Sequence, residues 1–303
     1  MRRTLGYIAF TLGCLLIFTA PLMRWYALPR VEKAPYDVDE KTVSLGSGQY
    51  FSPATFSLVG PVPVQNTQTA KGIPAKSNHR VAVINLFSRT VDLVNDVGMD
   101  YTNDVFAFDR NTGFAVHCCD EQPRHAGYTL KLPFNIDKSR AYPFWDTTAK
   151  AAIPVRYVRT EEVAGLQAYV FQSYVDDMAI GTLEIPASFD NGPDDENITA
   201  TRHYRATTTL WVEPFTGAIL KGGQVAAQWV TNPQGKFIMP LAFTDLLNDR
   251  ASVERTAKKI RDKLFQLRFV DFWFPVIGPL VGLVLLALSA VLLRRPRARR
   301  AGA

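Results

Sequence analysis

The sequence predicts a mainly β protein: an antiparallel sandwich- or barrel-like extracytoplasmic domain with an amphipathic stalk helix and two transmembrane helices. Three observations predict this class. Each end of the 303-residue chain carries a long uncharged apolar run, and short runs rich in β-branched and aromatic residues fill the middle. One segment before the second apolar run has helical periodicity. A purely water-soluble protein is therefore excluded.

The two apolar runs are long enough to cross a membrane as helices. Twenty uncharged residues run from Thr4 to Met23, and twenty-two run from Phe272 to Leu293. Twenty helical residues cover the roughly 30 Å of a bilayer's hydrocarbon core. We therefore predict transmembrane helices at 4–23 and 272–293. Residues 1–3 then form a short N-terminus, and residues 294–303 form a basic tail.

Basic residues predict that both ends of the chain are cytoplasmic. Arg2 and Arg3 precede the first span, and the second span is followed by five arginines: Arg294, Arg295, Arg297, Arg299 and Arg300. The lysines and arginines that flank the two spans on the side of the middle segment are about as many as those in the two tails. However, those residues alternate with acids such as Glu254 and Asp262, and Met-Arg-Arg before an apolar run resembles an export signal. We expect a cytoplasmic (inner) membrane protein with an extracytoplasmic main domain; cleavage after the first span stays open.

The net charge of +6 does not indicate an anionic polymer as partner. Seven of the 34 basic residues lie in the two tails, so residues 24–271 carry 27 basic and 28 acidic side chains. A protein that binds nucleic acid needs a concentrated basic patch. Nucleic acid is therefore excluded as a partner. The expected partners are the lipids of the cytoplasmic membrane.

Between the spans we expect a lead-in followed by one β domain. Residues 24–79 are rich in Pro and Gly, which favours an extended lead-in. Residues 80–243 read as the β domain. Its predicted strands include 80–87, 128–134, 166–174, 204–212 and 224–230. Predicted turns lie at 96–98, 111–113, 214–217 and 232–235, where Pro, Asn, Asp and Gly gather.

Residues 244–271 have the period of an amphipathic helix. One helical stripe contains six apolar residues and one arginine: Leu246, Arg250, Val253, Ala257, Ile260, Leu264 and Leu267. This pattern predicts a stalk helix that leads into the second span. The stripe either forms a lever or partner-binding surface, or packs against the β domain itself.

The cysteines leave three interpretations open. Cys14 lies in the first span, whereas Cys118 and Cys119 are neighbours in the run His117-Cys118-Cys119-Asp120. Neighbouring Cα atoms lie about 3.8 Å apart and bridged ones usually about 4.4 to 6.8 Å, so a bridge between them would be strained. The pair is therefore structural or incidental, a strained redox bridge, or part of a metal site.

The sequence contains no recognisable catalytic motif. It lacks the patterns G-x-S-x-G and H-E-x-x-H and a phosphate-binding loop, and its four histidines are scattered. The acidic run 190–197 lacks the alternating order of a calcium loop and is typical of a solvated hairpin tip. We therefore expect no enzyme, no cofactor and no resident metal.

Aromatic motifs in the predicted strands carry a family resemblance. They are Gly127-Tyr128, Pro133-Phe134, Tyr142, Trp145-Asp146, Tyr169-Val170-Phe171 and Trp211-Val212-Glu213-Pro214. In their order, and in the spans on either side, the chain resembles the actinobacterial two-span envelope proteins often labelled PorA-family porins. A porin crosses an outer membrane as a barrel of roughly 10-residue strands, whereas two apolar helices indicate a cytoplasmic membrane. We therefore expect no pore.

The resemblance implies a role in handling envelope lipids. One mycobacterial family member, a polar growth factor, is linked to trehalose monomycolate transport, so we expect an envelope lipid or glycolipid as ligand and an exporter or assembly protein as partner. The candidate lipid-contacting residues are Tyr128, Phe134, Tyr142, Trp145, Tyr169, Phe171 and Trp211. Aromatic residues at strand spacing also serve as core packing. The alternative is a non-enzymatic scaffold or sensor for envelope assembly.

Overall fold

The computed structural model describes residues 2–193 and 195–294, and the chain divides into two compact units. The first unit is helical and combines the residues up to Lys33 with those from Asp262 onward. The second unit, Ala34–Arg261, contains the sheet. The predicted class of a mainly β protein with two long apolar helices is thus confirmed. The predicted tail arginines from Arg295 onward lie outside the described residues.

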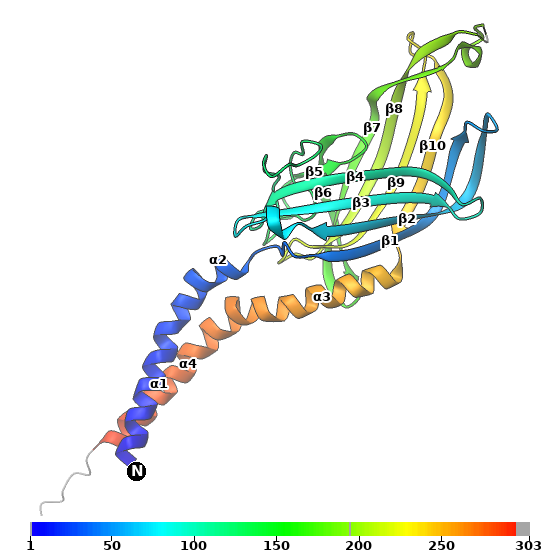
Figure 1. The fold of residues 1–303 in the computed structure, drawn as a ribbon. Helices are drawn as coiled ribbons and strands as arrows, with labels where there is room; N and C mark the ends of the chain where they lie inside the picture. The colour runs from blue at the N-terminus through cyan, green and yellow to red at the C-terminus, as the bar shows by residue number, and fades with distance from the viewer. Residues whose placement is uncertain (1, 194, 295–303) are drawn as a thin grey trace, which may run out of the picture. The chain divides into compact units, whose positions relative to one another are not determined.

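Both apolar runs form helices long enough to cross a membrane. The first continues through a π-helical turn into a short helix, and the second continues a preceding helix through another π-helical turn (Figure 1). The bounds are α1 (Arg2–Leu22), η1 (Met23–Ala27), α2 (Leu28–Val31), α3 (Arg250–Arg268), η4 (Phe269–Trp273) and α4 (Phe274–Leu293).

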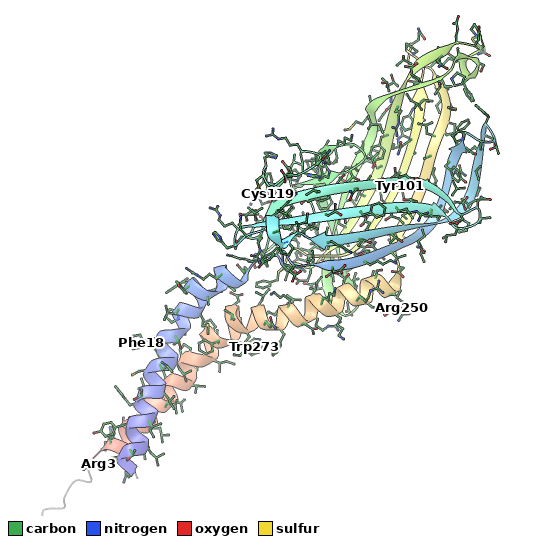
Figure 2. All side chains as sticks on the ribbon, viewed as in Figure 1. Arg3, Phe18, Tyr101, Cys119, Arg250 and Trp273 are labelled. Atoms are coloured by element: carbon green, nitrogen blue, oxygen red, sulfur yellow. A yellow bond between two sulfur atoms is a disulfide. The ribbon has the colours of Figure 1, made fainter. Side chains whose placement is uncertain are left out.

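Small residues let α1 and α4 pack closely as an antiparallel pair. A Cβ atom on Gly13 would lie 2.8 Å from the carbonyl oxygen of Gly282, and a Cβ on Gly282 would lie equally close to that of Gly13. Ser289 Oγ also donates a hydrogen bond of 2.8 Å to the carbonyl of Gly6. Small residues at such positions are typical of membrane helix pairs. Phe18, by contrast, is 71% exposed on the outer side of α1, as a lipid-facing residue would be (Figure 2).

The sheet has ten antiparallel strands in the order β4-β3-β2-β1-β10-β9-β8-β7-β6-β5. Strands β2 to β4 run across the direction of β8 and β9 in Figure 1, so the sheet is strongly twisted. The bounds are β1 (Asp39–Ser52), β2 (Ser57–Gly72), β3 (Val81–Asp92), β4 (Val97–Asp109), β5 (Tyr142–Asp146), β6 (Ala151–Val163), β7 (Leu166–Pro186), β8 (Asn197–Val212), β9 (Ile219–Thr231) and β10 (Phe237–Asn248).

Three of the named strand predictions fall inside the observed strands β7, β8 and β9, and the prediction 80–87 lies within β3 except at Arg80. The predicted turns at 214–217 and 232–235 close the connections β8–β9 and β9–β10. In the first of these turns, the buried carboxylate of Glu213 accepts hydrogen bonds from the backbone N–H and hydroxyl of Thr216, both at 2.7 Å. A carboxylate that bonds a following N–H in this way fixes a turn.

The segment predicted as an extended lead-in, 24–79, differs from the prediction in two ways. Its first residues are helical, in η1 and α2, and most of the rest forms β1 and β2 in the interior of the strand order. The glycines that suggested a lead-in instead allow close strand pairing: a Cβ on Gly46 would lie 1.7 Å from the carbonyl oxygen of Asp245 in β10. The sheet therefore begins at Asp39.

The run 128–134 was predicted to be a strand and makes only isolated bridges. It belongs to segment 110–141, whose backbone bonds reach both edge strands of the sheet. On the β4 side, Gln122 and Val105 exchange bonds of 2.7 and 3.0 Å; on the β5 side, Tyr128 N donates to the carbonyl of Pro143 at 2.7 Å. The backbone groups of this run thus form hydrogen bonds with loop residues and with the edge strand β5, and they do not form a regular strand ladder.

The main apolar clusters lie on one face of the sheet, which we call the inner face. Strand register places Phe171, Leu210, Tyr204, Val230 and Val64 on this face. All five are buried. Side chains of the inner face form separate apolar clusters along the strands, with polar residues between them.

Helix α3 carries the predicted apolar stripe, and its first turns pack on the sheet unit. Asp249 Oδ1 accepts a hydrogen bond of 2.9 Å from Ser252 N, which caps the helix. Val253, Ala257 and Ile260 are buried. The helix begins after β10, so Leu246 of the predicted stripe lies in a strand. A role as a stalk stays a prediction.

Candidate functional site

The seven aromatic candidates come from β5, β7, β8 and segment 110–141. Strand register places Tyr169 and Phe171 on the inner face and Trp211 on the opposite face of the sheet. Phe171 is fully buried, and Tyr142, Trp145 and Trp211 are less than a tenth exposed. The remaining three, Tyr128, Phe134 and Tyr169, are half-buried.

Most of these rings pack against one another. The ring centroids of Tyr128 and Tyr142 lie 5.6 Å apart, and those of Tyr142 and Phe171 lie 5.8 Å apart, both edge to face. Tyr157, which the sequence did not single out, joins Phe171 to Tyr169. Such pairs contribute about 0.5 to 1.5 kcal/mol beyond their buried area. These rings pack as core side chains, and their contact with a lipid stays a prediction.

Charged groups cover the edges of this aromatic region. The ammonium group of Lys138 lies 4.4 Å from the ring centre of Tyr169, and that of Lys221 lies 4.4 Å from Trp211. The indole N–H of Trp211 donates to Glu161. This hydrogen bond, helped by one from Arg159, holds the pKa of Glu161 below its usual range.

A second region, at the opposite end of the strands, exposes apolar side chains. We call it the distal end: it comprises the turns β1–β2, β3–β4 and β9–β10 and the connection β7–β8, and it lies away from the ends where the chain enters β1 and leaves β10. The exposed apolar residues at these turns or beside them are Phe56, Leu58, Leu93, Val94, Val97, Leu183 and Phe237, and we call them the distal rim. Sequence analysis missed them because single apolar residues in turns carry no periodic signal.

The distal rim adjoins a buried apolar cluster of the inner face. Phe56 stacks on Phe189 with ring centroids 6.2 Å apart, and Phe51 meets the same ring at 5.7 Å. Phe189 in turn packs on the buried residues Ile185 and Val230. A continuous apolar path therefore leads from exposed side chains to the inner face.

Polar residues line the inner face between this cluster and the aromatic region. Arg202 Nη2 donates to Gln228 Oε1 at 2.8 Å. Partial desolvation raises the pKa of the Asp100 carboxyl, although the residue stays open to solvent, and the charge of Arg202 opposes this shift. Asp100 lies in β4 and Arg202 in β8, so this electrostatic interaction acts between strands that are far apart in the strand order.

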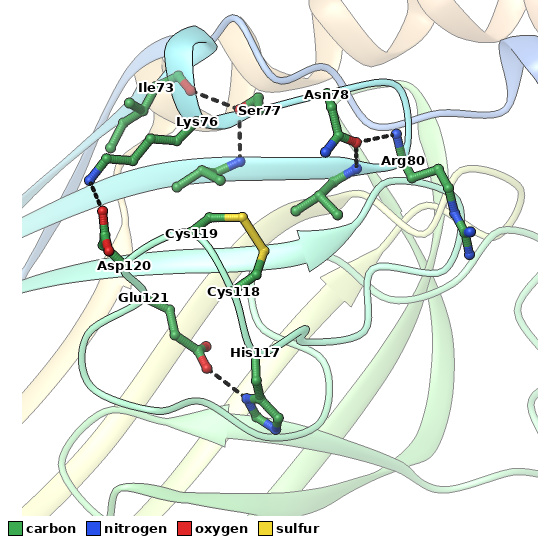
Figure 3. Close-up of a disulfide and its surroundings, with 12 residues drawn as sticks. Ile73, Lys76, Ser77, Asn78, Arg80, His117, Cys118, Cys119, Asp120 and Glu121 are labelled. Carbon is green, nitrogen blue, oxygen red and sulfur yellow. Dashed lines mark hydrogen bonds and ion pairs between the residues drawn. A yellow bond between two sulfur atoms is a disulfide. The ribbon is translucent and has the colours of Figure 1, made fainter.

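The turn that contains the adjacent cysteines holds a second cluster of polar side chains (Figure 3). A disulfide joins Cys118 to Cys119. His117 Nδ1 lies 2.6 Å from Glu121 Oε1, and the buried ring of His125 lies 3.6 Å from the other oxygen of Glu121 and 3.7 Å from Asp104. Among the described residues, neither ring nitrogen of His125 has a hydrogen-bond partner.

Among the residues that the structure describes, the cysteine turn does not form a metal site. No group of three His, Cys, Asp or Glu side chains there is arranged to hold a metal ion, and the two sulfurs that could have served as ligands bond each other. In the acidic run, Asp190 accepts hydrogen bonds from Asn232 at 2.7 Å and from Lys236 at 3.2 Å. These bonds fasten the run to the β9–β10 turn.

The fold and these sites define a membrane protein with two apolar helices and one antiparallel sheet unit. Residues 5–291 match the model of the family described as Porin PorA. Because the match covers nearly the whole chain, the protein belongs to this family. No curated protein matches the chain.

Proposed function

We propose that this protein is a membrane-tethered, non-enzymatic β domain that binds an envelope lipid or glycolipid and hands it to an exporter or envelope-assembly machine. The apolar path from the distal rim to the inner face carries the proposal. Exposed apolar side chains in a group are unusual on a monomeric protein surface and mark interaction sites. We further propose that the sheet unit is extracytoplasmic and that both termini are cytoplasmic.

The polar residues beyond this path suit an amphiphilic ligand. An acyl chain requires apolar contacts, whereas a sugar headgroup requires hydrogen-bond donors and acceptors. Phe56, which stacks on Phe189, offers apolar contacts, and Phe237 is a further exposed apolar side chain of the distal rim. Arg202, Gln228 and Asp100 offer polar groups on the inner face. The seven aromatic candidates remain additional proposed contacts.

Lipid binding is tested on the full-length protein purified in detergent. We expect native mass spectrometry to detect a co-purifying lipid and a fluorescent diacyl glycolipid to bind. Phe56→Ser combined with Phe237→Ser should weaken binding about tenfold or more, since burying one large apolar side chain contributes about 1.5 to 3 kcal/mol.

The matched control replaces exposed tyrosines outside the distal rim. Tyr101→Ser and Tyr174→Ser remove aromatic side chains that are 64% and 62% exposed, close to the exposure of Phe56, and should leave binding unchanged. The proposal fails if no lipid co-purifies and the probe does not bind, or if both pairs of variants lose binding equally.

A scaffold or sensor role is the second candidate, and the outer face of α3 favours it. Arg250, Lys258, Lys263 and Phe265 are exposed on this helix. Cross-linking in cells should then trap neighbouring proteins through α3. A variant with a shuffled outer face of α3 that retains full function would exclude this role.

A further inference from the structure

The disulfide between Cys118 and Cys119 is accessible from solvent. Both residues are half-exposed, and they line a shallow surface depression together with His117, Glu121 and Arg124. The third cysteine of the chain, Cys14, is separate from them in α1. A small reagent can therefore reach the bridge without unfolding of the sheet.

The turn that carries the bridge holds Cys119 in a backbone conformation that cysteine does not favour. Glu121 N donates to the carbonyl of Cys118 at 3.1 Å, and the two central residues, Cys119 and Asp120, have φ angles of 64° and 57°. Two successive left-handed residues are typical of Gly, Asn and Asp, not of Cys. Besides the turn's own hydrogen bond, the described contacts that hold it closed include the disulfide and the 3.0 Å ion pair of Asp120 with Lys76 (Figure 3).

The closed turn places the Glu121 carboxylate between two imidazoles. One oxygen is 2.6 Å from His117, and the other is 3.6 Å from the buried ring of His125. The next residue, Gln122, exchanges two backbone hydrogen bonds with Val105 of the edge strand β4. The shape of the turn is thus connected to the sheet and to a buried histidine.

From this arrangement we propose that the Cys118–Cys119 bridge is a thiol–disulfide exchange site for a low-molecular-weight thiol, and that its reduction opens the turn. A thiolate attacks one sulfur, the S–S bond breaks, and a mixed disulfide forms while the other cysteine leaves as a thiolate. A second thiol then resolves the mixed disulfide. Two thiols become one disulfide, and the two electrons and two protons that they lose appear on the cysteine sulfurs.

The surroundings of the bridge support both parts of the proposal. Arg124 lines the same depression, and a cation near a leaving thiolate stabilises it. Once the bond is broken, Cys119 is free to leave the left-handed region, and Glu121 moves away from His117 and His125 as the turn relaxes.

The exchange is tested on the full-length Cys14→Ser protein in detergent, in which Cys118 and Cys119 are the remaining cysteines. The protein is treated with reduced glutathione and then with N-ethylmaleimide under native conditions. We expect no alkylation before reduction and two alkyl groups on the peptide with Cys118 and Cys119 afterwards, with reversal by oxidised glutathione. Cys118→Ser with Cys119→Ser in the same background should take none.

The opening of the turn is read from Trp145, whose ring lies 5.0 Å from that of His125. Tryptophan emission should change on reduction, and the change should disappear in Trp145→Phe and in the variant without the pair. Two alkyl groups without any reductant, reduction only in denaturant, or a bridge between two copies on a non-reducing gel would overturn the exchange site. Unchanged emission after complete reduction would overturn the opening of the turn.

Discussion

Tyr204 shows how a single residue joins the polar and apolar parts of the inner face. Its side chain is fully buried, and its hydroxyl donates to Asp146 Oδ2 at 2.9 Å while accepting from Gln224 at 3.3 Å. Burial and the charge of Asp146 raise the pKa of Tyr204 well above its usual range. The tyrosine therefore remains neutral wherever the protein is folded under ordinary conditions.

Tyr204→Phe should destabilise the sheet unit by about 1 to 3 kcal/mol, because it leaves a carboxylate oxygen without its donor. The free energy of unfolding, measured by urea denaturation in detergent, checks this value. Tyr174→Phe is the matched control: that hydroxyl also bonds an aspartate, Asp176, but the side chain is exposed, so no change is expected. Equal losses in both variants would contradict the role of burial.

The same residue predicts a pH dependence. Unfolded tyrosine ionises near pH 10, whereas folded Tyr204 resists ionisation, so its contribution to stability is complete below about pH 10 and is lost as the pH rises further. The wild-type protein should therefore lose stability more steeply above pH 10 than Tyr204→Phe does. Identical alkaline profiles would show that Tyr204 ionises alike in both states.

At the scale of elements, the helix pair α1–α4 depends on the contact between Gly13 and Gly282. Gly13→Leu should push the helices apart and cost about 1 to 3 kcal/mol, as overpacking does in a close-packed contact. Leu12→Phe also adds volume, but at a side chain that is 46% exposed, and should have little effect. The temperature at which the detergent-solubilised protein loses its monodisperse peak distinguishes the two; a larger loss for Leu12→Phe would be inconsistent with this packing.

The elements also show where sequence reasoning succeeds. Long uncharged runs and strands with β-branched residues can be recognised from local sequence alone. Both spans and the strands β3, β7, β8 and β9 were therefore predictable. Strands β1 and β2 were not predictable, because their glycines and prolines are typical of a loop. In the structure, Gly46 instead allows β1 to pair closely with β10. The run 128–134 has strand composition, but its backbone bonds go to segment neighbours and to the edge strand β5.

The candidate site was predictable only in part, for a related reason. Of the seven aromatic residues, Tyr128, Tyr142 and Phe171 pack against one another and Tyr169 joins them through Tyr157, whereas Trp211 lies on the opposite face of the sheet. The distal rim arises from turns that are far apart in the sequence, such as those near Phe56 and Phe237. Only the strand order brings these turns to one end, and no single-sequence pattern encodes that order.

For the whole molecule, the two-span topology predicts opposite sides of the membrane for two exposed positions. Gln234→Cys lies in the β9–β10 turn and Arg294→Cys follows α4; both residues are exposed. In a Cys14→Ser background, a membrane-impermeant maleimide should label the former in intact cells and the latter only after permeabilisation. The reverse pattern would place the sheet unit in the cytosol and remove the proposed envelope role.

The place of β10 between β1 and β9 has a consequence for how the protein is made. Strand β10 is synthesised after the other nine strands but fills an interior position. The edges of β1 and β9 that face it therefore stay unpaired until residues 237–248 have been synthesised. Open edges of this kind invite pairing with other chains. Until β10 is in place, β1 and β9 therefore stay exposed to pairing with strands of other chains.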